Sequence, residues 1–316
     1  MKRVQYHRYG GPEVMRLEEF TPDTPGPGQV AVRVRAASVN PYDWKVRNGE
    51  MKYMTGRRFP RGMGYDFAGT VDAVGPRVSG FTVGDDIAGA AQIKASGAFA
   101  EMVIAEETSL AHKPAELSFP DAAAVPTIGS AALQALRDKG KFEPGQSIFI
   151  HGCLGGVGRA AVQIAATRGA NVVAGSCRPT SAADARRLGV APVVDFDDIP
   201  RSLAGQFDVV FDTVGTLPPA VARMLLTSGG RSVDIVPTPA KFLTSVLPGP
   251  FHVLIAKHNA ADLAELLTAS AHGALQVPIA KTVPLEHAID ALTDLEHHHT
   301  PRGGKLIITT SQLSTA

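Results

Sequence analysis

A glycine-rich stretch between residues 151 and 178 has the residue types and spacing of half a nucleotide-binding site. It reads HGCLGGVGRAAVQIAATRGANVVAGSCR. Gly155 and Gly158 follow an apolar run and open a helical pattern, which is the context that makes a glycine motif credible. Gly155 lets the backbone approach a pyrophosphate, and the helix start offers free N–H groups and a positive dipole end. Cys153 stands where the usual pattern has its first glycine, so a plain tight turn is the alternative.

The next predicted strand ends in Ser176-Cys177-Arg178, about 20 residues after the glycines. An NAD site normally places a carboxylate here, where it binds the ribose 2′-hydroxyl. No carboxylate is present, whereas Arg178 can pair with a 2′-phosphate and Ser176 can add a hydroxyl. The pattern therefore favours NADP(H) over NAD(H), and the alternative is that Arg178 is a solvated loop arginine.

The only two cysteines, Cys153 and Cys177, are too few for the disulfide framework of a secreted domain. We expect them close together at the ends of neighbouring strands. Two reduced, packed thiols are the simpler interpretation, and a redox switch is the alternative. The run His297-His298-His299 is interpreted as an exposed helix end rather than a metal site.

The overall composition is that of a globular enzyme. The chain has 316 residues, of which 44% are apolar and 19% charged. Its formal net charge of +1 favours neither nucleic acid nor an anionic membrane as a partner. No run of about 18 apolar residues occurs, and the N-terminal MKRVQYHRYGGPE lacks the apolar stretch of a signal peptide. We therefore expect a cytoplasmic protein without a transmembrane helix.

Two patterns divide the chain. Up to about residue 120, short alternating runs such as Val30–Arg35 lie between turns, which predicts an antiparallel, partly open β-barrel. From Ser147, apolar strands alternate with amphipathic helices, which predicts a parallel doubly wound sheet. Lys305–Thr309 is predicted to be a strand that returns to the first domain. The predicted boundaries are residues 1–122, 123–257 and 258–316.

Eight blocks, in order along nearly the whole chain, resemble the medium-chain dehydrogenase/reductase superfamily. Within it they are most similar to the zinc-independent, zeta-crystallin-like NADPH:quinone oxidoreductases. As a set the blocks are highly specific, although each alone is weak. They are YGGPE at 9–13, AASVNPYD at 36–43, GYDFAGTV at 64–71, GAFAE at 97–101, AAVP at 123–126, the loop at 151–165, FDTVG at 211–215 and RGGK at 302–305. Phe99 departs from the tyrosine of many relatives, and Cys153 from their alanine.

The resemblance implies a GroES-like domain formed from both chain ends and a Rossmann domain between them. It also implies NADP(H) as the cofactor and, commonly, a homodimer built through the Rossmann sheet. The resemblance assigns the pyrophosphate contacts to the glycine loop and the adenosine-phosphate contacts to Ser176 and Arg178. It assigns the nicotinamide contacts to the turn after the fourth Rossmann strand. The residues expected at the cofactor are Thr127, Gly155, Gly156, Val157, Gly158, Ser176, Arg178, Val214, Gly215 and Lys305.

Zinc-dependent relatives need a cysteine, a histidine and a further Cys or Glu near the cleft, and four cysteines for a structural site. Residues 1–152 contain no cysteine, and the two blocks that would hold ligands read Asn40-Pro-Tyr-Asp43 and Gly64-Tyr-Asp66. We therefore expect no metal ion. Without a Lewis acid a simple ketone is a poor substrate, whereas an enone or a quinone can be reduced with hydrogen-bond donors alone.

The expected reaction is hydride transfer from NADPH to a quinone or an α,β-unsaturated carbonyl. The candidates to hold the developing oxyanion or supply a proton are Asn40, Tyr42, Lys45, Tyr53 and Tyr65. Tyr42 and Tyr65 are favoured because they replace zinc-site blocks, and the alternative is that they only shape the pocket. Water is another candidate proton source. Asp43 is expected to cap a helix or join an ion pair rather than act as an acid.

Two other functions fit the same sequence. An enoyl-thioester reductase, like the reductase modules of fatty-acid or polyketide synthases, would share the cofactor and the hydride step. A non-catalytic NADPH-binding protein would share only the cofactor. The natural substrate depends on loops expected at residues 51–63 and 238–250, whose shape one sequence does not define.

Overall fold

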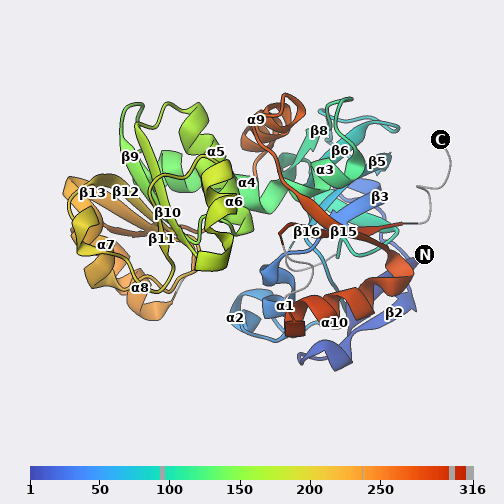
Figure 1. The fold of residues 1–316 in the computed structure, drawn as a ribbon. Helices are drawn as coiled ribbons and strands as arrows, with labels where there is room; N and C mark the ends of the chain where they lie inside the picture. The colour runs from blue at the N-terminus through green and yellow to red at the C-terminus, as the bar shows by residue number, and fades with distance from the viewer. Residues whose placement is uncertain (93–96, 237, 299–302, 311–316) are drawn as a thin grey trace. The chain divides into compact units, whose positions relative to one another are not determined.

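The computed structural model describes residues 1–92, 97–236, 238–298 and 303–310. The chain divides into two compact units (Figure 1). Unit 1 comprises residues 1–127, 258–272 and 277–316, and unit 2 comprises residues 128–257 and 273–276. The first and the last of the described residues therefore both belong to unit 1.

Unit 1 is built on two sheets that are mostly antiparallel. The larger has the strand order β15-β16-β3-β5-β6-β8, with β7 also paired to β3, and the smaller has the order β2-β1-β4. Alternation along β3 buries Val30, Val32 and Val34 together, as the sequence predicts. The strands are β1 Lys2–Tyr6, β2 Arg16–Glu19, β3 Gln29–Ser38, β4 Arg61–Gly62, β5 Asp66–Val74, β6 Asp86–Ala90, β7 Met102–Glu106, β8 Leu110–His112, β15 Ile279–Pro284 and β16 Lys305–Thr309.

Strand β16 brings the tail of the chain into the sheet of the first residues. It pairs antiparallel with β3, where Ile307 lies opposite Ser38, and parallel with β15. Leu306 and Ile308 are buried in the same apolar core as Val32. The prediction that the strand at 305–309 returns to the first domain is therefore confirmed.

The helices of unit 1 begin where the sequence supplies caps. Helix α1 starts after Asn40, with proline at its first position, and the Asp43 carboxylate accepts the backbone N–H of Asn40 at 2.7 Å. The expected capping role of Asp43 is therefore confirmed. Arg47, at the end of α1, is buried and pairs with Glu296 of α10. The helices are α1 Pro41–Arg47, α2 Lys52–Thr55, α3 Phe119–Ala124, α9 Ala260–Ala271 and α10 Ala288–His298.

Unit 2 contains the predicted parallel sheet, with the strand order β11-β10-β9-β12-β13-β14. The chain leaves β9 toward β10 and β11, then returns to the other side of β9 as β12. A sheet of this kind binds ligands where the strand order reverses, outside the carboxyl ends of β9 and β12. The strands are β9 Ser147–His151, β10 Val172–Cys177, β11 Val193–Asp195, β12 Phe207–Asp212, β13 Leu226–Asp234 and β14 Phe251–Val253.

One segment of unit 2 differs from its prediction. Residues 238–250 were expected to form a loop, but they contain α8, whose N-terminus is capped by the Thr238 side chain. A threonine followed by proline at the first helical position is a helix-start signal, and the predicted loop overlooked it. The expected loop at 51–63 likewise contains the short helix α2.

The other helices are α4 Pro126–Gln134, which crosses the boundary of the two units, α5 Gly156–Thr167, α6 Ala182–Arg187, α7 Pro219–Leu225 and α8 Pro239–Val246.

Of the helices that the structure describes, none is both long enough and apolar enough to cross a lipid bilayer.

Candidate cofactor-binding and catalytic sites

The glycine loop of unit 2 has the geometry of a pyrophosphate site. A Cβ on Gly158 would lie 2.2 Å from the carbonyl oxygen of Gly152, so only glycine fits there. A Cβ on Gly155 would meet the same oxygen at 3.4 Å, an ordinary contact. Gly155 is the N-cap of α5, which has 12 residues, and the first N–H groups of a helix are free to bind an anion. The backbone of residues 155–158 therefore fits a pyrophosphate.

The carboxyl ends of four strands lie in register beside this loop. His151 of β9 is paired with Ser176 of β10 on one side and with Asp212 of β12 on the other. Asp212 is in turn paired with Asp234 of β13. The segments that follow these residues therefore leave the sheet at the same edge, where the topology places a ligand.

Ser176 and Arg178 occupy different environments at the end of β10. Arg178 is exposed, whereas Ser176 is fully buried. The Ser176 hydroxyl lies 2.8 Å from Nδ1 of His151 and accepts the N–H of Gly152 at 3.3 Å. The exposed guanidinium is free to approach a phosphate, but the serine supports the first turn of the glycine loop. A direct role of Ser176 at a 2′-phosphate would require these contacts to change.

His151 contacts side chains from strand β10 and from two loops, and the sequence analysis did not single it out. Its Nδ1 contacts Ser176, its Nε2 lies 3.2 Å from the Thr216 hydroxyl, and its ring stacks on Phe196 with centroids 4.1 Å apart. Burial lowers the pKa of His151, although Asp212 and Asp197 oppose this effect. The only sequence feature that could have indicated this role of His151 is its position as a polar residue at the end of an otherwise apolar strand.

A carboxylate fixes the turn that was expected to lie at the nicotinamide. Asp212 accepts the backbone N–H groups of Val214 at 3.0 Å, Gly215 at 2.7 Å and Leu217 at 2.9 Å. The carbonyl oxygen of Gly215 accepts a hydrogen bond from Lys241 of α8 at 2.8 Å. Both predicted contact residues therefore lie on a hydrogen-bonded turn at the carboxyl edge of the sheet, with the Val214 side chain exposed.

Cys153 and Cys177 are free, buried thiols in mutual contact, so the predicted closeness is confirmed. Burial raises the pKa of Cys153 to about 12, and the neighbouring Cys177 adds to the shift. Burial also raises the pKa of Cys177. A thiol with a raised pKa holds little thiolate and reacts slowly with oxidants.

Three residues expected at the cofactor or substrate meet around one carboxylate inside unit 1. Asp66 accepts hydrogen bonds from Asn40 Nδ2 at 2.9 Å, from the Thr127 N–H at 3.1 Å and from the Thr127 hydroxyl at 2.6 Å. Lys305 Nζ donates to Asn40 Oδ1 at 2.6 Å and to the Val39 carbonyl at 2.9 Å. Both polar atoms of the Asn40 side chain therefore form hydrogen bonds within the protein.

The two favoured tyrosines are in contact with each other. The rings of Tyr42 and Tyr65 meet edge to face, with centroids 4.8 Å apart. The Tyr65 hydroxyl is buried and forms no hydrogen bond with any residue that the structure describes. Burial raises the pKa of both Tyr42 and Tyr65. Lys45 is half-buried on α1, and Tyr53 is 94% exposed. Tyr53 therefore lacks the enclosure expected of a catalytic side chain.

Within the described residues, no group of three or more His, Cys, Asp or Glu side chains is placed to hold a metal ion. The positions that carry zinc ligands in other members of the resembled family hold Asn40 and Tyr65-Asp66, and these side chains bond or pack within the protein. The residues present therefore do not fit a zinc site. His299 of the histidine run lies outside the described residues.

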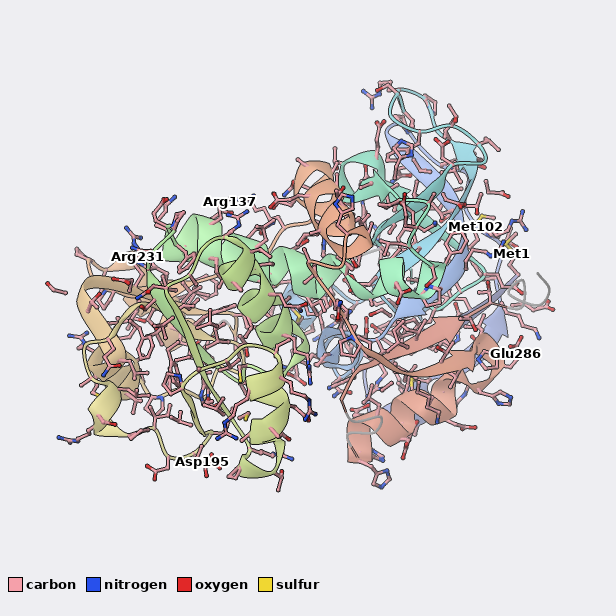
Figure 2. The ribbon with its side chains drawn as sticks, turned by 45° about the horizontal axis from the view of Figure 1, so that its top comes forward. Met1, Met102, Arg137, Asp195, Arg231 and Glu286 are labelled. Atoms are coloured by element: carbon pink, nitrogen blue, oxygen red, sulfur yellow. The ribbon has the colours of Figure 1, made fainter. Side chains whose placement is uncertain are left out.

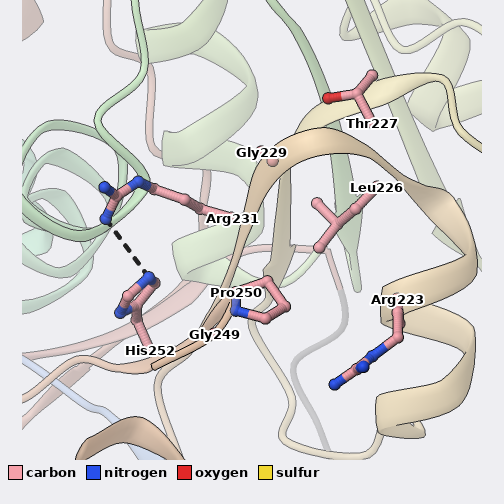
Figure 3. A pocket seen from close by; sticks show the side chains of 9 residues that line it. Arg223, Leu226, Thr227, Gly229, Arg231, Gly249, Pro250 and His252 are labelled. Carbon is pink, nitrogen blue, oxygen red and sulfur yellow. Dashed lines mark hydrogen bonds between the residues drawn. The ribbon is translucent and has the colours of Figure 1, made fainter. Parts of the chain in front are cut away.

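A cavity of about 430 Å³ lies in unit 2 away from the glycine loop (Figure 3). Arg231 and His252, which line it, are joined by a hydrogen bond of 3.4 Å. Figure 2 shows Arg231 and Arg137 at one end of this unit and Asp195, the last residue of β11, at the other. The cavity is thus remote from the carboxyl ends of the strands, and no predicted site residue lines it.

Comparison with known proteins identifies the family. Residues 26–115 match the alcohol dehydrogenase GroES-like domain, and residues 188–308 match the zinc-binding dehydrogenase family. A quinone oxidoreductase of Pseudomonas aeruginosa is 34% identical over 244 residues, which are 73% of this chain and 74% of that one. The chain belongs to the medium-chain dehydrogenase/reductase superfamily.

Two further relatives of this dehydrogenase/reductase show its fold and its general chemistry. The solved quinone oxidoreductase of Coxiella burnetii is 29% identical, has a TM-score of 0.89 and covers 98% of this chain and 99% of its own. It confirms the GroES-like domain and the Rossmann domain. The 2-methylene-furan-3-one reductase of Solanum lycopersicum is 36% identical over 247 residues, 74% of this chain and 61% of that one. The protein is therefore an NAD(P)-dependent oxidoreductase of a small molecule, while its relatives do not agree on one substrate.

Proposed function

We propose that this dehydrogenase/reductase uses NADPH to reduce a quinone or an α,β-unsaturated carbonyl without a metal ion. The observation that carries the proposal is the end of β10, where exposed Arg178 follows Ser176 and Cys177 and no carboxylate is present. A guanidinium pairs with a 2′-phosphate, whereas an NAD site needs a carboxylate for the ribose hydroxyl. The lack of any thiol before Cys153 supports chemistry without zinc.

In this proposal, each unit contributes distinct groups. When bound, NADPH would supply the hydride that adds to the conjugated carbon of the substrate. The backbone of residues 155–158 holds the pyrophosphate, and the turn fixed by Asp212 presents Val214 and Gly215 to the nicotinamide. Tyr42 and Tyr65 provide the hydroxyl groups that stabilise the oxyanion. These assignments are proposals that substitutions can test one by one.

Thr127, Asn40 and Lys305 receive a different role from the one expected. Asn40 and Thr127 donate to Asp66, and Lys305 donates to Asn40 and to the backbone. We therefore propose that these three side chains hold the α1 region in place. Lys45 stays a candidate for contact with the substrate oxygen, since it is half-buried and forms no ion pair with a residue that the structure describes.

The experiment that tests this function is an NADPH-oxidation screen over quinones, alkenals, enones and enoyl-thioesters, with NADH as the control. We expect turnover of at least one quinone or enone and a clear preference for NADPH. Reduction of enoyl-thioesters alone would select that rival activity. NADPH binding without oxidation across the whole panel would contradict catalysis.

The choice of NADPH is tested separately by Arg178→Gln. Losing a charged hydrogen bond costs about 1.5–3 kcal/mol, so the KM for NADPH should rise roughly 10- to 150-fold. The KM for NADH should hardly change. Arg201→Gln is the matched control, because Arg201 is another exposed arginine of unit 2 outside the carboxyl edge of β9 and β10. Equal effects of Arg178→Gln on both cofactors would contradict a role at the 2′-phosphate.

A further inference from the structure

The turn that follows β12 is held from one side by the carboxylate of Asp212. This carboxylate accepts three backbone N–H groups of the turn, those of Val214, Gly215 and Leu217. These bonds do not fix the carbonyl group of Gly215. Gly215 has a φ of +88°, in the left-handed region that glycine adopts without a steric penalty. The peptide between Gly215 and Thr216 therefore needs a further contact to keep one orientation.

Lys241 of α8 supplies this contact. Its ammonium group donates to the Gly215 carbonyl at 2.8 Å and pairs with Asp234, the last residue of β13. A hydrogen bond with a charged donor is roughly twice as strong as one between neutral groups. The Lys241 and Asp234 side chains are only 26% and 16% exposed, so water screens the pair weakly. The Gly215 carbonyl therefore points toward the β13 side of the turn.

Asp234 is itself fixed beside the turn. Its Oδ1 accepts the N–H of Val236 at 2.6 Å, while its Oδ2 accepts Lys241. Val236 packs directly on Gly215, where an added Cβ would lie 2.5 Å from the Val236 Cβ. Burial raises the pKa of Asp234, whereas the hydrogen bonds from Lys241 and the Val236 N–H lower it. The ammonium group thus favours the ionised carboxylate that holds it in place.

The direction of the Gly215 carbonyl determines the direction of the next N–H. The peptide between Gly215 and Thr216 is trans, and in a trans peptide the C=O and N–H bonds point in opposite directions. Strand β12 lies between β9 and β13 in the sheet. Since the carbonyl points toward β13, the Thr216 N–H points toward β9. The Thr216 hydroxyl agrees with this orientation, because it lies 3.2 Å from Nε2 of His151 at the end of β9.

The Thr216 N–H is an unused donor next to the glycine loop. It has no hydrogen-bond partner among the residues that the structure describes, and Thr216 is exposed. The same turn touches the start of the glycine loop, since the Thr213 hydroxyl lies 3.2 Å from the Gly152 carbonyl oxygen. Water solvates an exposed N–H until a ligand covers it, and a covered N–H needs an acceptor.

We infer that the Thr216 N–H donates a hydrogen bond to an oxygen of the nicotinamide half of the cofactor, and that Lys241 positions this donor. The inference rests on the proposed function, which places the pyrophosphate at residues 155–158 and the nicotinamide at the turn. Val214 and Gly215 were the contacts expected there, but Asp212 already accepts both of their N–H groups. The nicotinamide half offers two kinds of acceptor, the ribose hydroxyls and the carboxamide oxygen.

Lys241 acts through the Gly215–Thr216 peptide, so it is a positioning residue rather than a catalytic one. Without the ammonium group this peptide can rotate, because glycine tolerates either orientation. A shift of about 1 Å in a bound reactant can cost about 10²-fold in rate. The defect should be limited to the nicotinamide half, since no contact of Lys241 reaches Arg178 at the adenosine phosphate.

The donor is tested by NMR on wild-type protein labelled with isotopic nitrogen at its threonines. Thr216→Ser assigns the signal, because it keeps the N–H and the hydroxyl but removes one threonine. The Thr216 amide proton should shift downfield with NADPH and not with 2′,5′-ADP, which lacks the nicotinamide half. A shift with 2′-phospho-ADP-ribose identifies a ribose hydroxyl as the acceptor, and no shift with it identifies the carboxamide oxygen. An amide that responds to neither NADPH nor 2′,5′-ADP, or equally to both, overturns the inference.

The positioning role is tested by Lys241→Met, which keeps the length of the side chain but not its charge. Calorimetric affinity for NADPH should fall roughly 2- to 10-fold, the contribution of one neutral hydrogen bond. The affinity and number of sites for 2′,5′-ADP should not change. Lys241→Arg should restore most of the NADPH affinity, because a guanidinium can donate to Asp234 and to Gly215 together. Equal losses for both ligands would indicate a purely structural role and overturn the positioning role.

The matched control is Lys113→Met in unit 1. Lys113 is also half-buried and also donates to backbone carbonyl groups, those of Pro114 and Leu117. Lys113→Met should keep the wild-type affinity for both ligands. With an enone that the wild type reduces, Lys241→Met should lower kcat about 10²-fold, more than it lowers NADPH affinity. Lys113→Met should keep the wild-type kcat.

The outcomes separate this inference from the proposed function. If the wild type reduces no member of the panel, the proposed catalysis fails, and the Thr216 signal and the two affinities still decide the inference. If the protein binds NADH in preference to NADPH, the proposed cofactor fails, and NADH, ADP-ribose and ADP replace the three ligands of the titrations. If the wild type is active and Lys241→Met keeps its kcat and its NADPH affinity, positioning by Lys241 is overturned while the proposed function stands.

Discussion

His151 shows how much one buried side chain can contribute to a binding loop. It contacts Ser176 and Thr216 through its two ring nitrogens and stacks on Phe196. Ser176 in turn accepts the N–H of Gly152, the first residue of the glycine loop. The partners of His151 lie 25 and 65 residues away in sequence, so its role could not be predicted from local pattern.

Replacing His151 with phenylalanine tests this role. The ring still stacks, but both hydrogen bonds are lost, so we expect a stability loss of about 1–3 kcal/mol and weaker NADPH binding. Because folding lowers the pKa of His151, the wild type loses stability as the pH falls below ~6.5, and His151→Phe should lack this loss.

Denaturant titrations at pH 7 and pH 5 and a fluorescence titration with NADPH provide the measurements for His151→Phe. His252→Phe is the matched control, because His252 is a half-buried histidine on β14 beside the remote cavity. If His252→Phe weakens NADPH binding as much as His151→Phe does, the effect comes from general destabilisation.

Two glycines of one loop should respond differently to alanine. Gly158→Ala places a methyl group 2.2 Å from the Gly152 carbonyl oxygen, so we expect a stability loss of about 2 kcal/mol or more. Gly155→Ala makes only an ordinary contact within the protein, at 3.4 Å, and should keep the stability while weakening NADPH binding. Thermal unfolding and NADPH titration separate the effects, and a stable Gly158→Ala would contradict the packing described.

At the scale of elements, the sequence predicts most strands and helices and where they end. The alternation in β3 and the parallel strands of unit 2 both follow from periodicity and turn residues. Helix α8 was missed because residues 238–250 were expected to form a loop, although Thr238 is a helix cap. Elements that depend on neighbouring residues can thus be predicted from the sequence, whereas contacts between distant elements cannot.

The pairing of α1 with α10 is one such distant contact. Arg47 is fully buried and donates to both oxygens of Glu296, at 2.9 and 2.7 Å, across 249 residues of sequence. Removing one partner leaves a buried charge unpaired, so Glu296→Gln should lower the unfolding free energy by about 3–5 kcal/mol.

The matched comparison for Glu296→Gln is the Arg33–Asp72 pair, which joins two strands of unit 1 at the surface. Asp72→Asn should cost less than about 1 kcal/mol, because exposed ion pairs contribute little. Urea titrations of both variants give the comparison. Equal losses would show that the burial of Arg47 does not decide the energy of its pair.

At the scale of the whole molecule, the resemblance gives the two domains and the class of reaction, while the substrate stays a proposal. The glycine loop and Arg178 could be located from the sequence because their chemistry depends on neighbours along the chain. The cluster of Asn40, Asp66 and Lys305 could not, since Lys305 meets Asn40 across 265 residues. The sequence predicts Lys305 at the cofactor and Asn40 at the substrate, and in the structure the two side chains bond to each other within unit 1.

The family resemblance also predicts a homodimer through the Rossmann sheet, and one face of unit 2 suits this prediction. Strand β14 is at the edge of the sheet, and α8, which packs against it, exposes Leu243 and Val246, followed by the exposed Leu247. Leu243→Glu combined with Val246→Glu should turn a dimer into a monomer of 33.1 kDa in light scattering. A wild type that is already a monomer would contradict the prediction.

The position of β16 has a consequence for synthesis on the ribosome. Residues 128–257 and 273–276, which form unit 2, emerge before residues 305–309, so the Rossmann domain has its whole sheet available while translation continues. The first domain waits longer, because β3 gains its β16 neighbour only at the end. Lys305, whose ammonium group bonds to Asn40 and to the Val39 carbonyl, arrives with that same strand, so the nascent GroES-like domain lacks these buried hydrogen bonds until its final strand docks.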